Sequence, residues 1–216
     1  KIREAMNLVI DRQYIVDEIM GGLATPKFVP LSKGFPEYDR YKTTISTIET
    51  TYKYSFSRGQ KTISDELKKM GAELKGGKWY YKGKPVTVKF LIRSEDRRKA
   101  IGDYISGQLE KLGFTVERMY KTSREASPIW MSGDPALGEW DIYTGGWVTV
   151  IVARDTSDNF QYFYLPDSLM SFSPLWKAYN PTKEFRDIGN KLAQRSFKSM
   201  KERDLLMTKA LHLAMK

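Results

Sequence analysis

Residues 86–120, VTVKFLIRSEDRRKAIGDYISGQLEKLGFTVERMY, contain the pattern that decides the fold. Apolar and polar residues alternate over 86–92 and again over 114–120, and this alternation predicts two β-strands. The residues between them carry one apolar stripe at helical spacing, formed by Ile101, Ile105, Leu109 and Leu112. Gly113 follows the stripe and is expected to end the helix. The order strand, helix, strand predicts a right-handed crossover that makes the two strands parallel neighbours.

Periodicity and turn residues outline the elements on either side. Helices are expected over 1–10, from an Asp11 cap to Gly21-Gly22, over 62–70 and 123–131, after a Thr182 cap, and over 200–215. Glycine turns predict a hairpin at 76–84, and residues 140–147 are expected to add a third strand. Residues 21–60 are predicted to form an extended, loop-rich excursion, with 43–60 as loop. Together these elements predict one α/β lobe over 1–216, a mixed, mostly parallel sheet flanked by helices.

The composition is that of a soluble chain, which we expect to be part of a longer protein. Hydrophobic residues make up 41% and charged residues 29% of its 216 positions. The longest apolar stretch, Trp147–Ala153 interrupted by Thr149, is far shorter than the roughly 20 residues of a membrane-spanning helix. Residues Lys1–Met6 lack the pattern of an export signal and open directly into a helix. We therefore expect further sequence upstream.

Several enzyme classes are excluded by the residues that the chain lacks. It has no cysteine and one histidine, His212, which excludes thiolate chemistry and argues against a His-rich metal site or a Ser-His-Asp triad. Glu95-Asp96 stands at a predicted helix start, where acidic residues favour the helix dipole. Gly76-Gly77-Lys78 lacks the spacing and the hydroxyl residue of a phosphate-binding loop. The sequence thus predicts a protein that is not an enzyme and holds no cofactor or metal.

The net charge of +10 raises nucleic acid as a possible partner. The basic residues are dispersed, however, and alternate with acidic ones, as in Glu95–Lys99 and Lys198–Asp204. No run of five like charges occurs, and this favours a solvated basic face over a nucleic-acid-binding one. A nucleic-acid-associated domain remains the alternative hypothesis. The cysteine-free composition, rich in lysine and glutamate, is also compatible with a thermophilic source.

Six short motifs occur in one order along nearly the whole chain. They are Ile2–Arg12, Gly22–Pro26, Glu66–Gly71 with Gly77–Trp79, Ile105–Val116, Trp140-Asp141 with Gly146-Trp147, and Asn180-Pro181 with Lys201–Arg203. Each motif alone is weak, but the set in register resembles the family-5 extracellular solute-binding proteins of ABC transporters. Members of that family bind oligopeptides, dipeptides or nickel.

The resemblance implies a type II periplasmic-binding-protein fold, in which two lobes close on a ligand. It places this chain in the second lobe, with most of the first lobe absent. It also implies an extracellular or periplasmic protein, associated with the membrane in its full-length form. Such a protein would act as a monomer and deliver a peptide or an oligosaccharide to the permease subunits of an importer. No nucleic acid is expected as a partner.

The expected ligand-binding residues gather at the end of the predicted third strand. Ligands of open α/β sheets lie beyond the carboxyl ends of the strands, which is where Trp147 is expected. Gly145 and Gly146 before it allow close approach of the backbone. The resemblance also places Trp147 in the ligand cleft, and Trp140 is a further candidate. The alternative for both tryptophans is a place in the core.

A carboxylate for a peptide amino terminus is displaced or missing. The family's peptide binders carry an aspartate three residues after the cleft tryptophan, where this chain has Val150. Asp155 or Asp158 could take that role after an insertion, or could instead shape a turn. Aromatic rings follow closely at Phe160, Tyr162, Phe163 and Tyr164, and these suit sugar stacking, apolar pockets or a core. If no carboxylate binds the amino terminus, an oligosaccharide is a more plausible ligand than a peptide, and both ligands stay open.

Overall fold

The computed structural model describes residues 1–147, 155–168 and 170–216. The chain forms two compact units. Unit 1 comprises Lys1–Pro26 and Lys53–Trp147, and unit 2 comprises Lys27–Tyr52 and Val148–Lys216. Each unit has a hydrophobic core of its own. That residues 1–216 together make one ligand-binding lobe stays a prediction, because it concerns both units at once.

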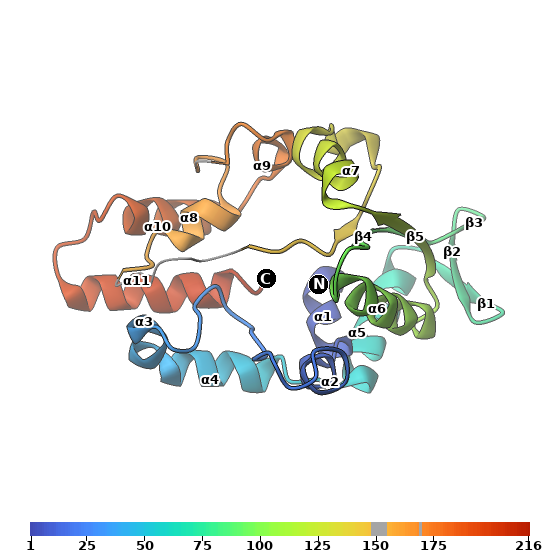
Figure 1. Cartoon of the computed structure of the whole chain (residues 1–216), viewed down its shortest axis with the longest axis horizontal. Helices are drawn as coiled ribbons and strands as arrows, with labels where there is room; N and C mark the ends of the chain where they lie inside the picture. Colours follow the sequence, from blue (N-terminus) through green and yellow to red (C-terminus); the bar gives the residue numbers. More distant parts are fainter. Residues whose placement is uncertain (148–154, 169) are drawn as a thin grey trace. The chain divides into compact units, whose positions relative to one another are not determined.

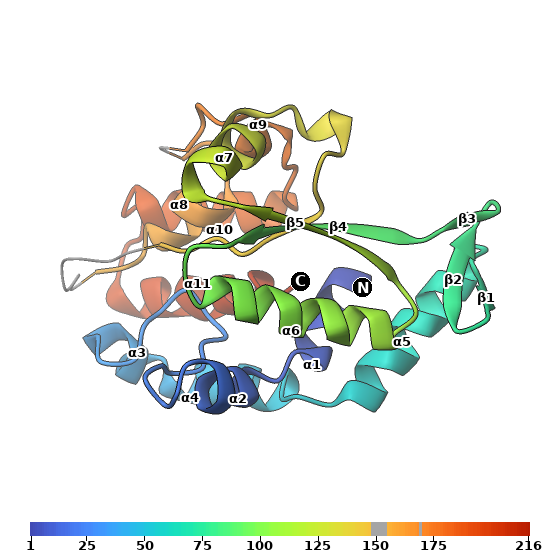
Figure 2. The same ribbon diagram turned by 45° about the vertical axis from the view of Figure 1, so that its right-hand side comes forward.

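A three-stranded parallel sheet organises unit 1. Its strands stand in the order β5 (Thr115–Lys121), β4 (Thr87–Arg93) and β6 (Ile142–Tyr143). The β4–β5 register runs from Thr87 opposite Thr115 to Arg93 opposite Lys121, which confirms the predicted parallel pair. Helix α6 (Arg98–Lys111) connects the two strands and lies along one face of the sheet (Figure 2).

Close packing of α6 on β4 builds the centre of unit 1. Phe90, Leu91 and Ile92 of β4 are fully buried. Gly102 of α6 faces Ile92 so closely that an added Cβ atom would lie 2.6 Å from Ile92 Cγ2. A glycine at this point lets the helix approach the strand more closely than a larger residue would allow.

A small antiparallel meander adjoins this core. It consists of β1 (Glu73–Lys75), β2 (Lys78–Tyr81) and β3 (Lys84–Pro85), which confirms the predicted hairpin and extends it by a strand. Trp79 anchors the meander because its side chain is only 1% exposed and its Nε1 donates to the Leu112 carbonyl at 2.9 Å.

Helices complete unit 1. They are α1 (Ile2–Val9), α2 (Arg12–Tyr14), the π-helical turn η1 (Ile15–Ile19), α5 (Phe56–Lys69), α7 (Ser123–Ser127), the π-helical turn η2 (Pro128–Ser132) and the 3-10 turn η3 (Pro135–Leu137). The predicted Asp11 cap is confirmed, since its carboxylate accepts from the backbone N–H groups of Gln13 and Tyr14. Helix α1 packs on α5, where Gly59 leaves room for Val9.

Unit 2 is helical in its described part. Its helices are α3 (Pro36–Arg40), α4 (Lys42–Thr51), α8 (Asn159–Tyr164), α9 (Pro174–Ala178), α10 (Lys183–Ala193) and α11 (Met200–Leu213), as Figure 1 shows. The predicted Thr182 cap is confirmed by its hydrogen bond from the Phe185 N–H. Ile45, Phe160 and Leu192 are fully buried in one core. Phe160 therefore belongs to the core rather than to a stacking surface.

A buried arginine holds three segments of unit 2 together. Arg203 of α11 is 4% exposed and donates to Glu37 of α3, to the Tyr41 hydroxyl at 2.8 Å and to Asp155 at 2.8 Å. Glu37, 5% exposed, also accepts from the Thr156 backbone N–H at 2.7 Å. A buried charge requires such partners, because removing one would leave the other unpaired in a medium of low polarity.

The predicted loop over 43–60 is wrong. This range contains most of α4 and the first residues of α5, which begins at Phe56 rather than at residue 62. Threonine and serine favour helices weakly, and this concealed the helical spacing of Tyr41, Ile45 and Ile48. Burial of the two isoleucines in the core outweighs that low propensity. Within 21–60, the residues outside helices are therefore chiefly those before α3, together with 52–55 between α4 and α5.

The third strand is shorter than the predicted 140–147. Only Ile142 and Tyr143 pair with β4 as a strand. On either side, the backbone N–H groups of Asp141 and Thr144 still donate to carbonyls of β4. Side chains add to these bonds: Asp141 Oδ2 accepts from the Lys89 N–H and Thr144 Oγ1 from the Arg93 N–H, both at 2.8 Å. Helices α8 and α9 are further elements that periodicity did not predict.

No helix within residues 1–147, 155–168 and 170–216 is long and apolar enough to cross a membrane. The sheet and its helices confirm the predicted α/β class, although among the described residues its parallel strands are confined to unit 1. Because ligands of open α/β sheets bind beyond the carboxyl ends of the strands, a ligand-binding site is expected at that edge of the unit 1 sheet.

Gly102 and Gly107 lie on the same helix and offer a matched test of the packing of α6. A Cβ atom at Gly107 would meet no heavy atom within 4 Å, in contrast to one at Gly102. We expect Gly102→Ala to lower the free energy of unfolding by about 1 to 2 kcal/mol, because overpacking outweighs the gain in helix propensity. Gly107→Ala should raise it by up to about 1 kcal/mol. Denaturant unfolding followed by circular dichroism measures both, and equal effects would contradict this packing.

Candidate functional site

The carboxyl ends of the three parallel strands lie at one edge of the unit 1 sheet. Arg93, Lys121 and Tyr143 are the last residues of β4, β5 and β6. Helix α6 begins at the same edge, because it follows β4 after a short turn. Charged and aromatic side chains from separate segments therefore meet there.

Four aromatic rings form a cluster at this edge. Tyr143 stacks on Trp130 of η2, with ring centroids 5.5 Å apart and an angle of 21° between the rings. Trp147 meets Trp130 edge-on at 6.2 Å, and Trp140 meets Tyr143 edge-on at 6.3 Å. Trp147 is 51% exposed, so the cluster presents one large ring to solvent and supports it from beneath. We call these four residues the aromatic cluster.

Packing holds Trp130 in place rather than a hydrogen bond. Its Nε1 is buried, and within the described ranges of the chain it has no acceptor. Trp130 follows Pro128 in a π-helical turn, and such turns occur often at functional sites. The turn continues α7, which begins with a capping box formed by Thr122 and Glu125.

Gly145 and Gly146 bring the backbone close to neighbouring side chains. A Cβ atom at Gly145 would lie 3.2 Å from the Tyr143 ring, and one at Gly146 would lie 3.3 Å from Arg98 Nη1. Both glycines are themselves exposed. The backbone at these glycines is thus close to Tyr143 and Arg98. Contact of these glycines with a ligand stays a prediction.

Two arginines flank the cluster, and each pairs with an acid close by in sequence. Arg93 Nη2 lies 2.5 Å from Glu95 Oε2, which also accepts from the Ser123 N–H at 2.7 Å. Glu95 thereby ties the end of β4 to the start of α7. Hydrogen bonds from the Arg98 side chain and backbone lower the pKa of Asp96 to about 2. The charges at this edge are therefore largely balanced locally.

Asp155, a predicted ligand contact, is engaged within unit 2. Its Oδ1 accepts from the Ser157 N–H at 3.0 Å, from Ser157 Oγ at 2.5 Å and from Arg203 Nη2 at 2.8 Å. Its Oδ2 lies 3.4 Å from Arg195 Nε. Burial raises the pKa of Asp155, but the hydrogen bonds from Ser157 and Arg203 outweigh burial and lower that pKa to about 2. The carboxylate is thus ionised and internally neutralised.

The remaining predicted residues divide between the two units. Trp140 joins Trp147, Gly145 and Gly146 at the edge of the unit 1 sheet, where its ring meets Tyr143. Asp158 is an exposed residue before α8 in unit 2, and its side chain makes no capping hydrogen bond to that helix. Val150, which stands at the family's aspartate position, lies outside the described residues.

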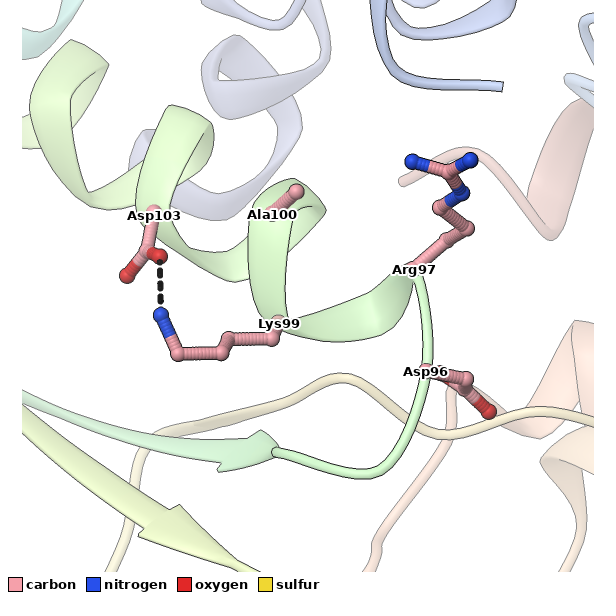
Figure 3. A pocket seen from close by; sticks show the side chains of 5 residues that line it. All are labelled: Asp96, Arg97, Lys99, Ala100 and Asp103. Carbon is pink, nitrogen blue, oxygen red and sulfur yellow. Dashed lines mark hydrogen bonds and ion pairs between the residues drawn. The ribbon is translucent and has the colours of Figure 1, made fainter. Parts of the chain in front are cut away.

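An open depression at the start of α6 is a less suitable site. It has a volume of about 490 Å³ and is lined by Asp96, Arg97, Lys99, Ala100 and Asp103. Figure 3 shows Lys99 paired with Asp103, at 3.2 Å, while Arg97 points away from them. No aromatic ring is among its lining residues, and two of its acids are paired, Asp96 with Arg98 and Asp103 with Lys99. It offers neither stacking nor an enclosed surface.

No three His, Cys, Asp or Glu side chains within the described ranges come together in a way that could hold a metal ion. Sequence reasoning identified Trp147 and Trp140 but missed the partners that orient them. Trp130 and Tyr143 are isolated aromatics in the sequence, and Arg93 and Arg98 are two of many basic residues. Only the folding of η2 against β6 brings these residues together, and no local motif signals it.

A model of a protein family, described as "Bacterial extracellular solute-binding proteins, family 5 Middle", matches residues 1–169. Curated protein sequences yielded no match. Among solved structures, the mannohexaose-bound periplasmic oligopeptide-binding protein of Thermotoga maritima has a TM-score of 0.77 and 20% identity, over 100% of this chain and 39% of that one.

Two further structures share the fold at low identity. Bacillus subtilis AppA, an oligopeptide-binding protein in complex with a nonapeptide, has a TM-score of 0.69 and 15% identity, over 99% of this chain and 39% of its own. Campylobacter jejuni NikZ in complex with Ni(L-His) has a TM-score of 0.67 and 17% identity, over 98% of this chain and 38% of its own. The chain thus spans about two fifths of these proteins. The likeness confirms the predicted binding-protein fold.

The ion pairs of Asp155 predict a pH-dependent contribution to stability. Because the pKa of the folded-state carboxyl is about 2, below its ordinary value of 3.8, this contribution is present above pH 4 and is lost as the pH falls toward 2. We expect Asp155→Asn to lower the free energy of unfolding by about 1 to 2 kcal/mol near neutral pH. The difference from the unsubstituted chain should shrink between about pH 4 and pH 2.

Thermal unfolding over this pH range measures the effect of Asp155→Asn. The matched control is Asp158→Asn, which changes the same charge three residues away at an exposed position. It should leave the melting temperature nearly unchanged at each pH. If instead both substitutions are silent near neutral pH, the ion pair contributes nothing to stability and Asp155 is available for another role.

Proposed function

Because the chain belongs to the bacterial extracellular solute-binding proteins of family 5, we propose that it supplies ligand-binding surface to the substrate-binding protein of an ABC importer. The motif-based resemblance to this family is confirmed. The family consists of binding proteins rather than enzymes. In this proposal the protein acts outside the cytoplasm, as a monomer, and releases its ligand to the permease subunits.

The aromatic cluster is the observation that carries the proposal. The half-exposed indole of Trp147 meets Trp130 edge-on, and Tyr143 stacks on Trp130, so neighbouring rings support an exposed flat apolar face. Rings held in this way lose little conformational entropy when a ligand stacks on them. Trp147 would stack on a planar or ring-shaped part of the ligand, while Trp130 and Tyr143 keep its ring in place. Gly146, next to Trp147 in the sequence, has no side chain that could block access to that face.

We infer that the ligand is an oligosaccharide rather than a peptide. To bind a peptide amino terminus, a site needs an ionised carboxylate that can accept further hydrogen bonds from the ammonium group. Asp155 already accepts hydrogen bonds from Ser157 and Arg203, so an ammonium group would have to displace internal partners. Near the cluster itself, the acids Glu95 and Asp96 are likewise paired, with Arg93 and Arg98. An uncharged sugar chain needs no carboxylate for its binding.

The solved relatives support a range of ligands on this scaffold. The oligopeptide-binding protein of Thermotoga maritima was solved with bound mannohexaose, although its name refers to peptides. The related structures carry a nonapeptide and a nickel complex. For this chain, the exposed ring of Trp147 and the hydrogen-bonded carboxylate of Asp155 favour an oligosaccharide over a peptide or a nickel complex.

Trp147→Ala tests the proposal in the natural protein that carries this chain. We expect thermal stabilisation by mannohexaose or a related oligosaccharide, of about 2.7 kcal/mol at a hundred times its dissociation constant. Loss of a large anchoring ring should weaken binding by about 2 kcal/mol, or roughly thirtyfold. A thermal-shift titration, repeated by calorimetry, measures both quantities.

Tyr81→Ala is the control for this test. Tyr81 is also an exposed aromatic residue of unit 1, with 42% of its surface exposed, but lies on the meander outside the aromatic cluster. The Tyr81→Ala variant should bind the oligosaccharide with the same affinity as the unsubstituted protein. Stabilisation by a nonapeptide alone, abolished by Asp155→Asn, would replace the oligosaccharide with a peptide. Stabilisation by nickel and histidine alone would refute both ligands.

A further inference from the structure

The β1–β2–β3 meander is a basic surface that lies apart from the aromatic cluster. In Figures 1 and 2 it stands beside the ends of α5 and α6 within unit 1. Residues 73–85 carry four lysines and one acid, a net charge of +3, and all five side chains are exposed. The lysines are Lys75, Lys78, Lys82 and Lys84. Basic residues are dispersed over the chain as a whole, but within this meander they outnumber acidic residues four to one.

The charge of the meander is only partly neutralised. Among the ion pairs of the described residues, those of the meander are limited to Lys75 with Glu73, at 2.5 Å. Lys78 lies near Glu110, but that carboxylate pairs with Arg118 at 2.6 Å. Lys75 and Lys78 stand directly opposite each other in the strand register. The net charge of +3 therefore remains on the meander and is complementary to an anionic surface.

Exposed apolar side chains accompany the lysines. Leu74 is 54% exposed, Tyr81 is 42% exposed and Met70, at the end of α5, is 61% exposed. In the strand register Leu74 lies opposite Trp79 and Lys84 lies opposite Tyr81, so Leu74, Tyr81 and Lys84 share one face of the meander. Lys75 and Lys78 lie on the other face. Lys82 Nζ lies 5.3 Å from the Tyr81 ring centroid. Apolar and tyrosine side chains beside lysines are typical of surfaces that enter the headgroup region of a membrane.

We propose that the meander binds anionic phospholipid headgroups at a membrane surface. Lys82 and Lys84, beside Tyr81, would contact the phosphates, while Leu74, Met70 and the Tyr81 ring would lie at the boundary between headgroups and acyl chains. Lys75 and Lys78, on the other face, would add longer-range attraction to the anionic surface. The exposed aliphatic groups favour a lipid surface over a nucleic acid, whose backbone offers them no apolar partner. This binding is independent of the ligand at the aromatic cluster and goes beyond the proposed function.

Vesicle co-sedimentation of the whole chain tests the proposal. We expect binding to vesicles of phosphatidylcholine mixed with phosphatidylglycerol, little binding to phosphatidylcholine alone, and weaker binding as salt is added. Each lysine removed should lower the partition coefficient roughly fivefold. The variant K75Q/K78Q/K82Q/K84Q should therefore lose on the order of a hundredfold or more. The variant L74S/Y81S should lose the part of the binding that persists at high salt.

The control variant K191Q/K198Q/K201Q/K209Q removes the same charge from exposed lysines of unit 2. It should bind anionic vesicles almost as the unsubstituted chain does. Equal losses in both variants would overturn the proposal, because net charge alone would then explain binding. Binding to double-stranded DNA that exceeds binding to vesicles and disappears in the meander variant would also overturn it. Circular dichroism melting of each variant verifies that the fold is intact.

Discussion

The parallel pairing of β4 with β5 is the interaction on which the candidate site depends. Seven residue pairs hold these strands in register, and α6 must return antiparallel to them to make the connection. The carboxyl ends of the strands and the start of α6 consequently meet at one edge. Arg93, Arg98 and Tyr143 are brought together by this geometry, although they are spread over about fifty residues of sequence. Gly102 permits it by letting α6 approach Ile92.

Short pairing of β6 gives the aromatic cluster its form. Backbone pairing covers two residues, and the side chains of Asp141 and Thr144 extend the contact with β4 at both ends. The chain after Thr144 is then released from the ladder while still fixed near the sheet. Trp147 can therefore turn its ring onto Trp130 and remain half exposed. A longer strand would direct alternate side chains to opposite faces of the sheet and would break this contact.

In unit 2 the need to neutralise a buried charge decides the role of a candidate residue. Arg203 requires acceptors in the core, and Glu37 and Asp155 provide them from distant segments. This demand makes Asp155 a structural partner of α11, while its contact with a ligand stays a prediction. It also gives a physical reason for the arginine in the motif Lys201–Arg203, which the resemblance to the family highlighted without assigning it a task.

Local patterns determined much of the fold: the strand–helix–strand unit, the meander, the caps at Asp11 and Thr182, and the tryptophan at the sheet edge. Such signals succeed because spacing, turns and capping act within a few residues. Tertiary structure alone decided the helix over Lys42–Thr51, which packing stabilises against a weak propensity. It also decided the partners of Trp147 and Asp155, because these come from segments far apart in the chain, and burial and charge balance select them only once the core has formed.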